Sequence, residues 1–272
     1  MKLRHIAIKG FKSIDADMGL SLPLGNITVL LGANGSGKSN LVSFFNMLNF
    51  MTTGALGQYV GQQGASRLLF YGPKKTESIS FELQFEDASA VDTYSASLSY
   101  GLPDRLFFAK EEITFARKNA TTPQQYSLQG IDTESGLKTD SNKTSNVVYA
   151  LLSRIRTYQF HDTSDTAKIK DRGYVDDAKY LRHDAGNLAA FLKMLQGHSR
   201  YTKYYARIVR HIQRVMPQLG DFDLESVPGN KDYVRLNWKD SSGSDYLFDP
   251  HQISDGSLRF MALAALCWVR RT

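Results

Sequence analysis

A glycine-rich stretch with one lysine and one serine carries the clearest chemistry in the chain. It has the G-x-x-x-x-G-K-S spacing of a phosphate-binding loop and is followed by an asparagine: Gly32-Ala33-Asn34-Gly35-Ser36-Gly37-Lys38-Ser39-Asn40. Glycine adopts backbone angles that other residues avoid, so successive N–H groups can turn inward around an anion. The pattern therefore predicts a nucleotide site.

The polar side chains and the flanks of this stretch have expected roles. Lys38 is expected to reach the β- and γ-phosphates, and the Ser39 hydroxyl to ligate Mg²⁺. An apolar run at 27–31 and a helical pattern at 39–50 predict a strand, a turn and a helix N-terminus. That helix end would add unpaired N–H groups and a positive dipole. The alternative is a flexible turn that merely contains glycines, and the flanking elements argue against it.

The composition is that of an ordinary globular chain. Its 272 residues are 42% hydrophobic and 22% charged, which suits one large α/β domain or two smaller lobes. It has no apolar run that could cross a bilayer, no signal-peptide core and one cysteine, Cys267, so we expect a cytoplasmic protein. The formal net charge of +6 permits contact with nucleic acid, and it equally fits a solvated surface.

The first half of the chain predicts an antiparallel sheet. Apolar residues alternate loosely at 2–9 and strictly at 78–86, and a meander of about four strands fits 66–130. The turn after the first strand contains Lys12 and Ser13, which could contact a nucleotide phosphate. An exposed turn lysine is the simpler interpretation from composition. Polar residues 132–145 predict a mobile loop.

Helical patterns dominate the second half. Helices are predicted at 147–155, 188–196 and 199–216, and strands at 156–160, 221–227, 233–238 and 245–248.

The helix predicted at 199–216 is amphipathic. Its polar face carries Lys203, Arg207, Arg210 and Arg214. These cations could meet a phosphate backbone, and a solvated helix face is the commoner explanation.

Two further polar clusters have a structural and a functional interpretation. The segment Ser254-Asp255-Gly256 begins a predicted helix. In the structural interpretation, Ser254 or Asp255 caps this helix. In the functional interpretation, the N-terminus of the helix forms a second anion site. His161 and Asp162 could position water or Mg²⁺, or form a hydrogen-bonded turn. Taken alone, each cluster favours the structural interpretation.

Together, these stretches resemble one family. A Gly-Phe-Lys-Ser turn, the phosphate loop and a downstream Ile-Ser-Asp-Gly-Ser-Leu-Arg-Phe segment are similar to ABC-type ATPase heads of the RecF and SMC class, in particular the predicted AAA-family ATPases of bacteria. Segments 158–164 and 250–256 also look like that group's motifs. The resemblance implies an α/β P-loop fold: a mixed sheet around the P-loop helix, an antiparallel β-subdomain and a helical subdomain with the signature motif. The corresponding division of a single head is 1–50, 66–130, 146–216 and 221–272.

The resemblance also implies ligands and partners. ATP and Mg²⁺ would bind the Walker A loop at 32–39, and Lys12 and Ser13 match a position that approaches the nucleotide. Ser254, Asp255 and Gly256 would belong to the signature that completes the ATP site of a second copy, so that ATP joins a homodimer. Implied further partners are DNA and an effector protein, in repair, chromosome handling or phage defence, with no membrane contact.

Other matches to that family are weaker. Gln84 corresponds loosely to its Mg²⁺-sensing glutamine, although a regular alternating strand argues against this role. Family heads continue after the signature with a strand that ends in Asp-Glu, whereas this sequence stops at Thr272. We therefore expect no catalytic residue in this chain, and we expect a truncated head with an exposed interior sheet edge.

Three functional classes follow. The first is an ATPase head that hydrolyses ATP when intact. The second is a non-catalytic ATP-binding module whose shape a partner recognises. The third, a small-molecule kinase, has less support because no acceptor pocket is visible in the sequence.

Overall fold

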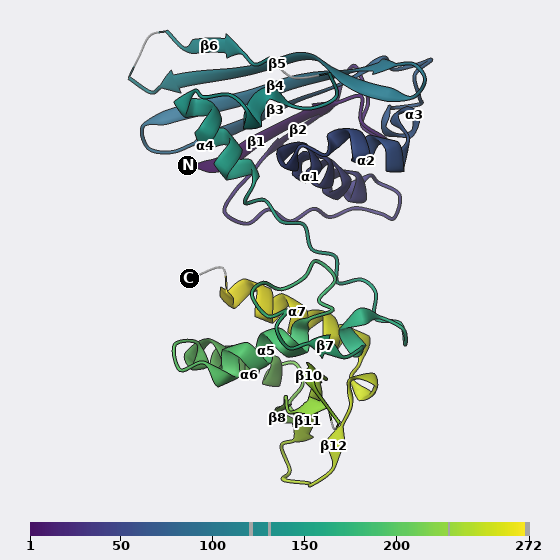
Figure 1. Cartoon of the computed structure of the whole chain (residues 1–272), viewed down its shortest axis with the longest axis vertical. Coiled ribbons are helices and arrows are strands. Elements are labelled where there is room, and N and C mark those ends of the chain that lie inside the picture. Colours follow the sequence, from purple (N-terminus) through teal and green to yellow (C-terminus); the bar gives the residue numbers. More distant parts are fainter. Residues whose placement is uncertain (120–121, 130–131, 228, 270–272) are drawn as a thin grey trace. The chain divides into compact units, whose positions relative to one another are not determined.

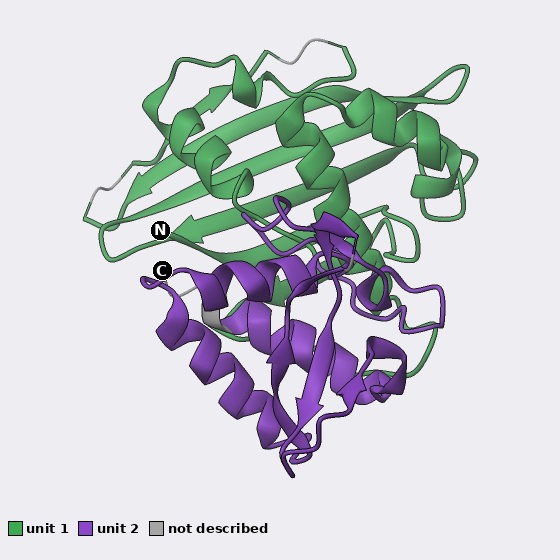
Figure 2. Ribbon diagram, turned by 60° about the horizontal axis from the view of Figure 1, so that its bottom comes forward, with its two compact units in different colours: residues 1–157 green, residues 158–272 purple. Residues whose placement is uncertain are grey.

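The computed structural model describes every residue except 120–121, 130–131, 228 and 270–272 (Figure 1). It contains two compact units, residues 1–157 and 158–272, which Figure 2 draws in different colours. Each unit encloses its own apolar core.

A six-stranded antiparallel sheet forms one layer of unit 1, with the strand order β2-β1-β3-β4-β5-β6. The strands are β1 Lys2–Lys9, β2 Leu20–Pro23, β3 Ser78–Glu86, β4 Ala90–Gly101, β5 Arg105–Arg117 and β6 Gln124–Ser127. The alternating pattern of β3 buries one side of the strand and leaves the other partly exposed. The predicted first strand and the four-stranded meander are confirmed.

Helices cover one face of this sheet (Figure 1). They are α1 Lys38–Thr53, α2 Leu56–Gln63, α3 Ala65–Leu68, the 3-10 turn η1 Gly136–Lys138 and α4 Lys143–Leu152. The buried ring of Phe44 on α1 lies 5.3 Å from Phe81 of β3 and 5.8 Å from Phe11, both edge to face. This aromatic cluster fixes α1 on the sheet.

The strand predicted at 27–31 is not formed. Ile27, Val29 and Leu31 are 86%, 72% and 90% exposed. An apolar run predicts burial, but a strand also requires a neighbour that pairs with its backbone. No strand within the described residues pairs with this segment.

The loop predicted to be mobile at 132–145 is instead tethered. Glu134 accepts hydrogen bonds from the N–H groups of Leu56 and Gly57 at 3.0 and 2.8 Å. Gly136 donates to the buried Glu111 at 2.9 Å. Polar residues indicate a loop, but the sequence does not show which distant groups they bind.

The described residues of unit 2 form three α-helices and two small antiparallel sheets, whose strand orders are β7-β10-β9 and β12-β11-β8. Its elements are η2 Lys168–Lys170, β7 Gly173–Tyr174, α5 Leu188–Gly197, α6 Thr202–Gln213, β8 Leu219–Asp223, β9 Ser226–Val227, β10 Asn230–Val234, β11 Asn237–Asp240, β12 Leu247–Phe248, η3 Pro250–Gln252 and α7 Asp255–Val269. The helices predicted at 188–196, at 199–216 and after Ser254 correspond to α5, to the shorter α6 and to α7, while the helix predicted at 147–155 overlaps α4 of unit 1. The strand predicted at 156–160 is not formed; Gln159 instead donates its N–H to the carbonyl of His183, outside any sheet.

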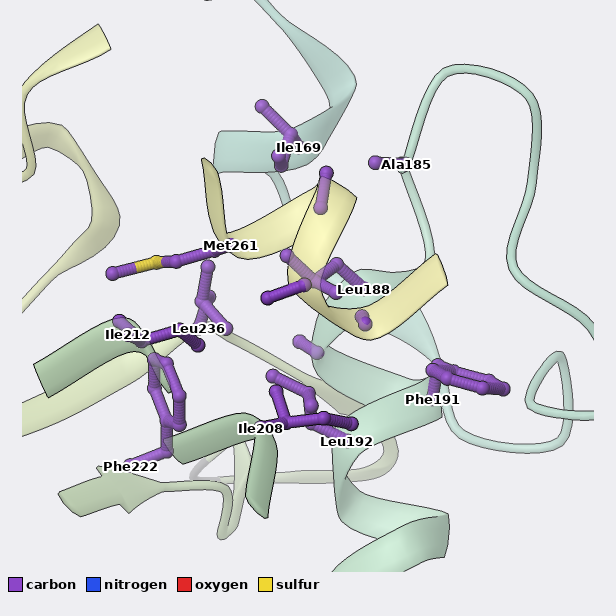
Figure 3. Packing of buried hydrophobic residues seen from close by; sticks show 14 of the residues in the cluster. Ile169, Ala185, Leu188, Phe191, Leu192, Ile208, Ile212, Phe222, Leu236 and Met261 are labelled. Carbon is purple, nitrogen blue, oxygen red and sulfur yellow. The ribbon is translucent and has the colours of Figure 1, made fainter. Parts of the chain in front are cut away.

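The core of unit 2 lies where its three helices meet. Figure 3 shows Leu188 and Leu192 of α5, Ile208 and Ile212 of α6, and Met261 of α7 gathered there, and all five are buried. Apolar residues three and four apart place one side of α6 inward and leave its polar side outside. In the described part of the chain, no helix is both long and apolar enough to cross a membrane.

Asp92 of β4 is an unfavourably placed carboxylate. It is buried between the cross-strand neighbours Phe85 and Phe115, and its Oδ1 has no hydrogen-bond partner among the described residues. Desolvation, with a smaller contribution from Asp87, raises the pKa of Asp92 to about 6.

The substitution Asp92→Asn should stabilise the protein at neutral pH. The folded-state pKa of about 6 exceeds the unfolded value of about 3.9, so stability falls as pH rises through this window. Urea unfolding should show a gain of about 1–3 kcal/mol at pH ~7.5 and little change at pH ~4. Asp17→Asn, at an exposed position, is the matched control. An equal gain at both pH values would contradict this explanation.

Candidate nucleotide-binding site

The phosphate loop leads directly into the N-terminus of α1. Gly35 and Gly37 have φ angles of 83° and 88°, in the left-handed region that favours glycine. At Gly32 a Cβ would lie 2.8 Å from Ser36 Oγ. Helix α1 has neither a side-chain cap nor an acidic residue in its first turn. Its N–H groups and positive dipole end are therefore available to an anion.

Lys38 lies across this loop. Its Nζ donates to the carbonyls of Gly32 and Ala33 at 2.7 and 2.6 Å, and to Ser36 Oγ at 3.2 Å. These contacts hold an ammonium beside the helix N-terminus. Fixed N–H groups and a fixed cation together provide the charge arrangement that binds a polyphosphate.

The turn after β1 approaches the loop from a second direction. Ser13 Oγ accepts a hydrogen bond from Asn40 Nδ2 at 2.5 Å, and a Cβ on Gly37 would lie 2.9 Å from the same oxygen. Lys12 Nζ donates to Ser43 Oγ on α1 at 2.5 Å. Partial burial lowers the pKa of Lys12. The structure thus brings Lys12 and Ser13 together with the loop, where composition alone favoured an exposed turn.

A cavity of about 670 Å³ begins at Lys12 and Ser13 and extends beyond them. Its other lining residues include Gln62, Arg67 and Tyr71, none of which the sequence indicated as site residues. Tyr71 is 81% exposed and has a φ of 53°. In the sequence, the local feature that indicates this side of the cavity is an aromatic residue, Tyr71, directly before Gly72.

Ser39 is the residue expected to bind metal. It is exposed in the first turn of α1, next to Lys38. Mg²⁺ is usually bound through one or two protein oxygens together with substrate phosphates and water, so a single hydroxyl fits this role. Within the described residues, no three His, Cys, Asp or Glu side chains form a metal-binding group. Gln84 contacts Glu82 on the side of β3 opposite its buried residues, away from α1.

The predicted signature turn lies in unit 2 at the start of α7. Ser254 Oγ accepts a hydrogen bond from the N–H of Ser257 at 3.2 Å and donates to its hydroxyl at 2.9 Å, so Ser254 caps the helix. Asp255 and Gly256 are exposed. A Cβ on Gly256 would meet nothing within 4 Å, so internal packing does not require glycine there.

The loop that contains His161 and Asp162 is tied to the same helix. Arg259 of α7 donates to the carbonyl of His161 at 3.0 Å and to Thr163 Oγ1 at 3.3 Å. Asp162 accepts hydrogen bonds from the hydroxyl and N–H of Ser164, which lower the pKa of Asp162. The hydrogen-bonded turn is therefore confirmed.

Residues 27–272 match the family model described as AAA domain, putative AbiEii toxin, Type IV TA system. The chain belongs to this AAA domain family. Family membership confirms the resemblance to AAA-type ATPases and the expected α/β P-loop class. A search of curated proteins found no match.

Solved structures of SMC ATPase heads are also similar to this AAA-domain chain. One, from work on ATP-driven dimerization and DNA-stimulated activation of SMC ATPases, has 16% identity and a TM-score of 0.34, covering 59% of this chain and 87% of its own. The Smc head of Pyrococcus furiosus bound to the C-terminal domain of ScpA has 14% identity and a TM-score of 0.44, covering 99% of this chain and 79% of its own.

Two glycine substitutions should distinguish the effect of backbone strain in the phosphate loop from the effect of a steric clash with Ser13. Gly37→Ala and Gly35→Ala both place a side chain at positive φ, but only the Cβ at position 37 meets Ser13 Oγ, whereas position 35 opens onto free space. We expect Gly37→Ala to weaken binding of a fluorescent ATP analogue at least about tenfold more than Gly35→Ala, because it also displaces Ser13. Equal losses would show that contact with Ser13 does not matter.

Proposed function

We propose that this AAA-domain chain is the ATP-binding head of an ABC-type ATPase, with both units belonging to one head. The observation that carries the proposal is the phosphate loop itself. Left-handed glycines, an uncapped helix N-terminus and the ammonium of Lys38 converge on one turn. The AAA family match supports a nucleotide ligand.

The proposal gives each part of the nucleotide a position that this geometry supports. The triphosphate lies against residues 32–40, with Lys38 beside its β- and γ-phosphates. Ser39 supplies an oxygen to Mg²⁺, which would neutralise phosphate charge. Lys12 and Ser13 lie between the loop and the adjoining cavity, so the ribose and base extend into that cavity toward Tyr71. A phenol ring at the cavity wall suits the face of a purine.

Lys38→Ala should reduce ATP affinity by at least about tenfold, because the loop then lacks its fixed cation. Lys74→Ala, which removes an exposed lysine of the same unit, is the control and should leave affinity unchanged. Calorimetric titration with Mg·ATP measures both variants, and unchanged binding in Lys38→Ala would contradict the assignment.

Turnover measured in parallel with affinity distinguishes the two leading classes. If the unmodified chain releases phosphate from ATP and Lys38→Ala abolishes this release, the result indicates an ATPase. Tight binding with negligible phosphate release indicates a non-catalytic module that ATP holds in a shape recognised by a partner.

The exposed signature turn is the proposed contact with a second copy. Ser254 and the N-terminus of α7 would approach the γ-phosphate bound by the partner's loop, so that ATP joins two heads. Gly256 supports this role, since the chain's own packing leaves free space around it. A small residue at such a turn permits close approach of another molecule.

A complementation experiment tests this arrangement. Gly256→Leu should fold normally, because position 256 is exposed and a Cβ there meets nothing within 4 Å, yet it should block ATP-dependent dimerisation in sedimentation analysis. Lys38→Ala alone should fail as well. A mixture of the two variants should recover dimers, because one of the two composite sites then has both an intact loop and an intact turn. Undiminished dimerisation of Gly256→Leu would rule out the turn as the contact.

A further inference from the structure

One lysine of unit 2 is buried without a strong partner. Only 6% of the Lys170 side chain is exposed, although lysine is almost never buried unless its charge is paired. Among the described residues, its ammonium has one ion pair, with Asp165 at 3.6 Å, and donates no hydrogen bond. The Asp165 side chain is 95% exposed, so water weakens this pair. The buried charge therefore lacks an adequate compensating acceptor.

The core of unit 2 fixes the position of this lysine. Lys170 is the last residue of the 3-10 turn η2, and Ile169 beside it is buried in that core (Figure 3). The N–H of Lys170 also donates to the carbonyl of the buried Ala167 at 2.9 Å. In contrast, Lys168 of the same turn has an exposed side chain and pairs with Asp184. The turn thus contains one ordinary surface lysine and one lysine that the fold buries.

Lys170 lines a cavity of about 290 Å³ within unit 2. Two other basic side chains line it, Arg235 directly after β10 and His251 on η3. Neither side chain makes a hydrogen bond, an ion pair or a ring contact with another described residue. Three basic groups therefore reach one cavity from three separate segments of the chain.

Three aspartates also line the cavity, and the fold limits their effect on an anion. Asp249 caps η3 and accepts the N–H of His251 at 2.8 Å. Asp171 accepts the N–H of Arg172 at 2.7 Å. The third, Asp165, is almost fully exposed, where water reduces the strength of its field. Two of the carboxylates are thus stabilised by backbone donors, and the other is screened.

We propose that this cavity binds a small molecule through a phosphate group, with Lys170 and Arg235 as the counter-charges. Water can accept hydrogen bonds from these donors but cannot neutralise the buried charge, whereas an oxyanion does both. A phosphate has enough oxygens to accept from three basic groups, whereas a carboxylate has two. A cavity of about 290 Å³ is small for a ligand pocket and suits inorganic phosphate or a small organic phosphate.

This site is separate from the candidate nucleotide site. All of its lining residues belong to unit 2, whereas the phosphate loop belongs to unit 1. The inference therefore does not rest on ATP binding. Because the phosphate loop would also bind phosphate, every sample in the test carries Lys38→Ala, and any binding that remains at the loop is common to all variants.

Calorimetric titration of the full chain with inorganic phosphate and with ribose 5-phosphate tests the proposal. Arg235→Ala, at an exposed position, should lose affinity by about fivefold or more, and Lys170→Met by at least about tenfold, because each removes a charged donor. Arg210→Ala removes an exposed arginine of the same unit that does not line the cavity. This matched control should leave affinity unchanged.

The variant Asp165→Asn distinguishes a ligand site from a structural ion pair. If Lys170 serves only to pair with Asp165, this variant should lower stability and leave phosphate affinity unchanged. If the cavity binds phosphate, loss of the nearby negative charge should tighten binding by about twofold or more. In phosphate-free buffer, Lys170→Met should unfold at a higher urea concentration than its parent, because an apolar side chain replaces an uncompensated buried charge.

The proposal fails if neither probe binds at ~10 mM, if Arg210→Ala loses as much affinity as Arg235→Ala, or if Asp165→Asn leaves binding unchanged or weaker. Acetate bound as tightly as phosphate would also overturn it, since the cavity would then be a carboxylate site. Tighter binding of ribose 5-phosphate than of inorganic phosphate would support a ligand with an organic part. The reverse order would support free phosphate as the ligand.

Discussion

The packing of the buried Phe44 ring is the interaction on which the geometry of the candidate nucleotide site depends. Its ring packs against Phe81 of the sheet and against Phe11 in the turn after β1. Because Phe11 is followed directly by Lys12 and Ser13, the contact that fixes α1 also brings this turn to the start of the helix. The hydrogen bond from Asn40 to Ser13 completes the same junction. One packing interaction therefore positions two sides of the site.

The cavity wall is held by backbone contacts to that turn. Lys12 donates its N–H to the carbonyl of Leu68 at 2.7 Å, and Phe70 donates to Gly10 at 3.0 Å. Gly10 has a φ of 71°, and a Cβ there would lie 2.4 Å from the carbonyl oxygen of Ser78. The turn thus lies too close to β3 for any side chain at this position. The loop, the turn and the cavity form one connected arrangement within unit 1.

Short sequence patterns predicted those parts of the candidate site that are formed by residues close together in the chain. The phosphate loop, β1 and the meander each follow from spacing or alternation over fewer than about fifteen residues. The cap at Ser254 also follows from residue type. In contrast, Gln62, Arg67 and Tyr71 lie on or beside the short helices α2 and α3. The sequence does not show that the segment at the end of α3 pairs with the turn after β1 through Leu68, Leu69 and Phe70.

Non-local pairing explains the errors. The apolar run at 27–31 predicted a buried strand, but its side chains are exposed. A strand depends on backbone partners that the run itself cannot reveal. The loop around His161 is held by Arg259, 98 positions away. No periodicity in either segment indicates that contact. Hydrophobic patterns predict which side of an element is buried, and they predict its partner only when the two are neighbours in sequence.

The phosphate loop lies in an acid-free stretch, 18–76, that contains only four lysines and arginines. The positive potential at its turn therefore comes from the oriented backbone N–H groups of the loop and α1 together with the ammonium of Lys38. Such N–H groups act at hydrogen-bond distance and depend on a fixed backbone shape. Long, exposed cations act instead over about a Debye length and are screened by salt. An anion that binds at this turn as proposed should therefore depend less on salt than one held by exposed cations. A rigid turn of this kind suits a small ligand that fits its shape.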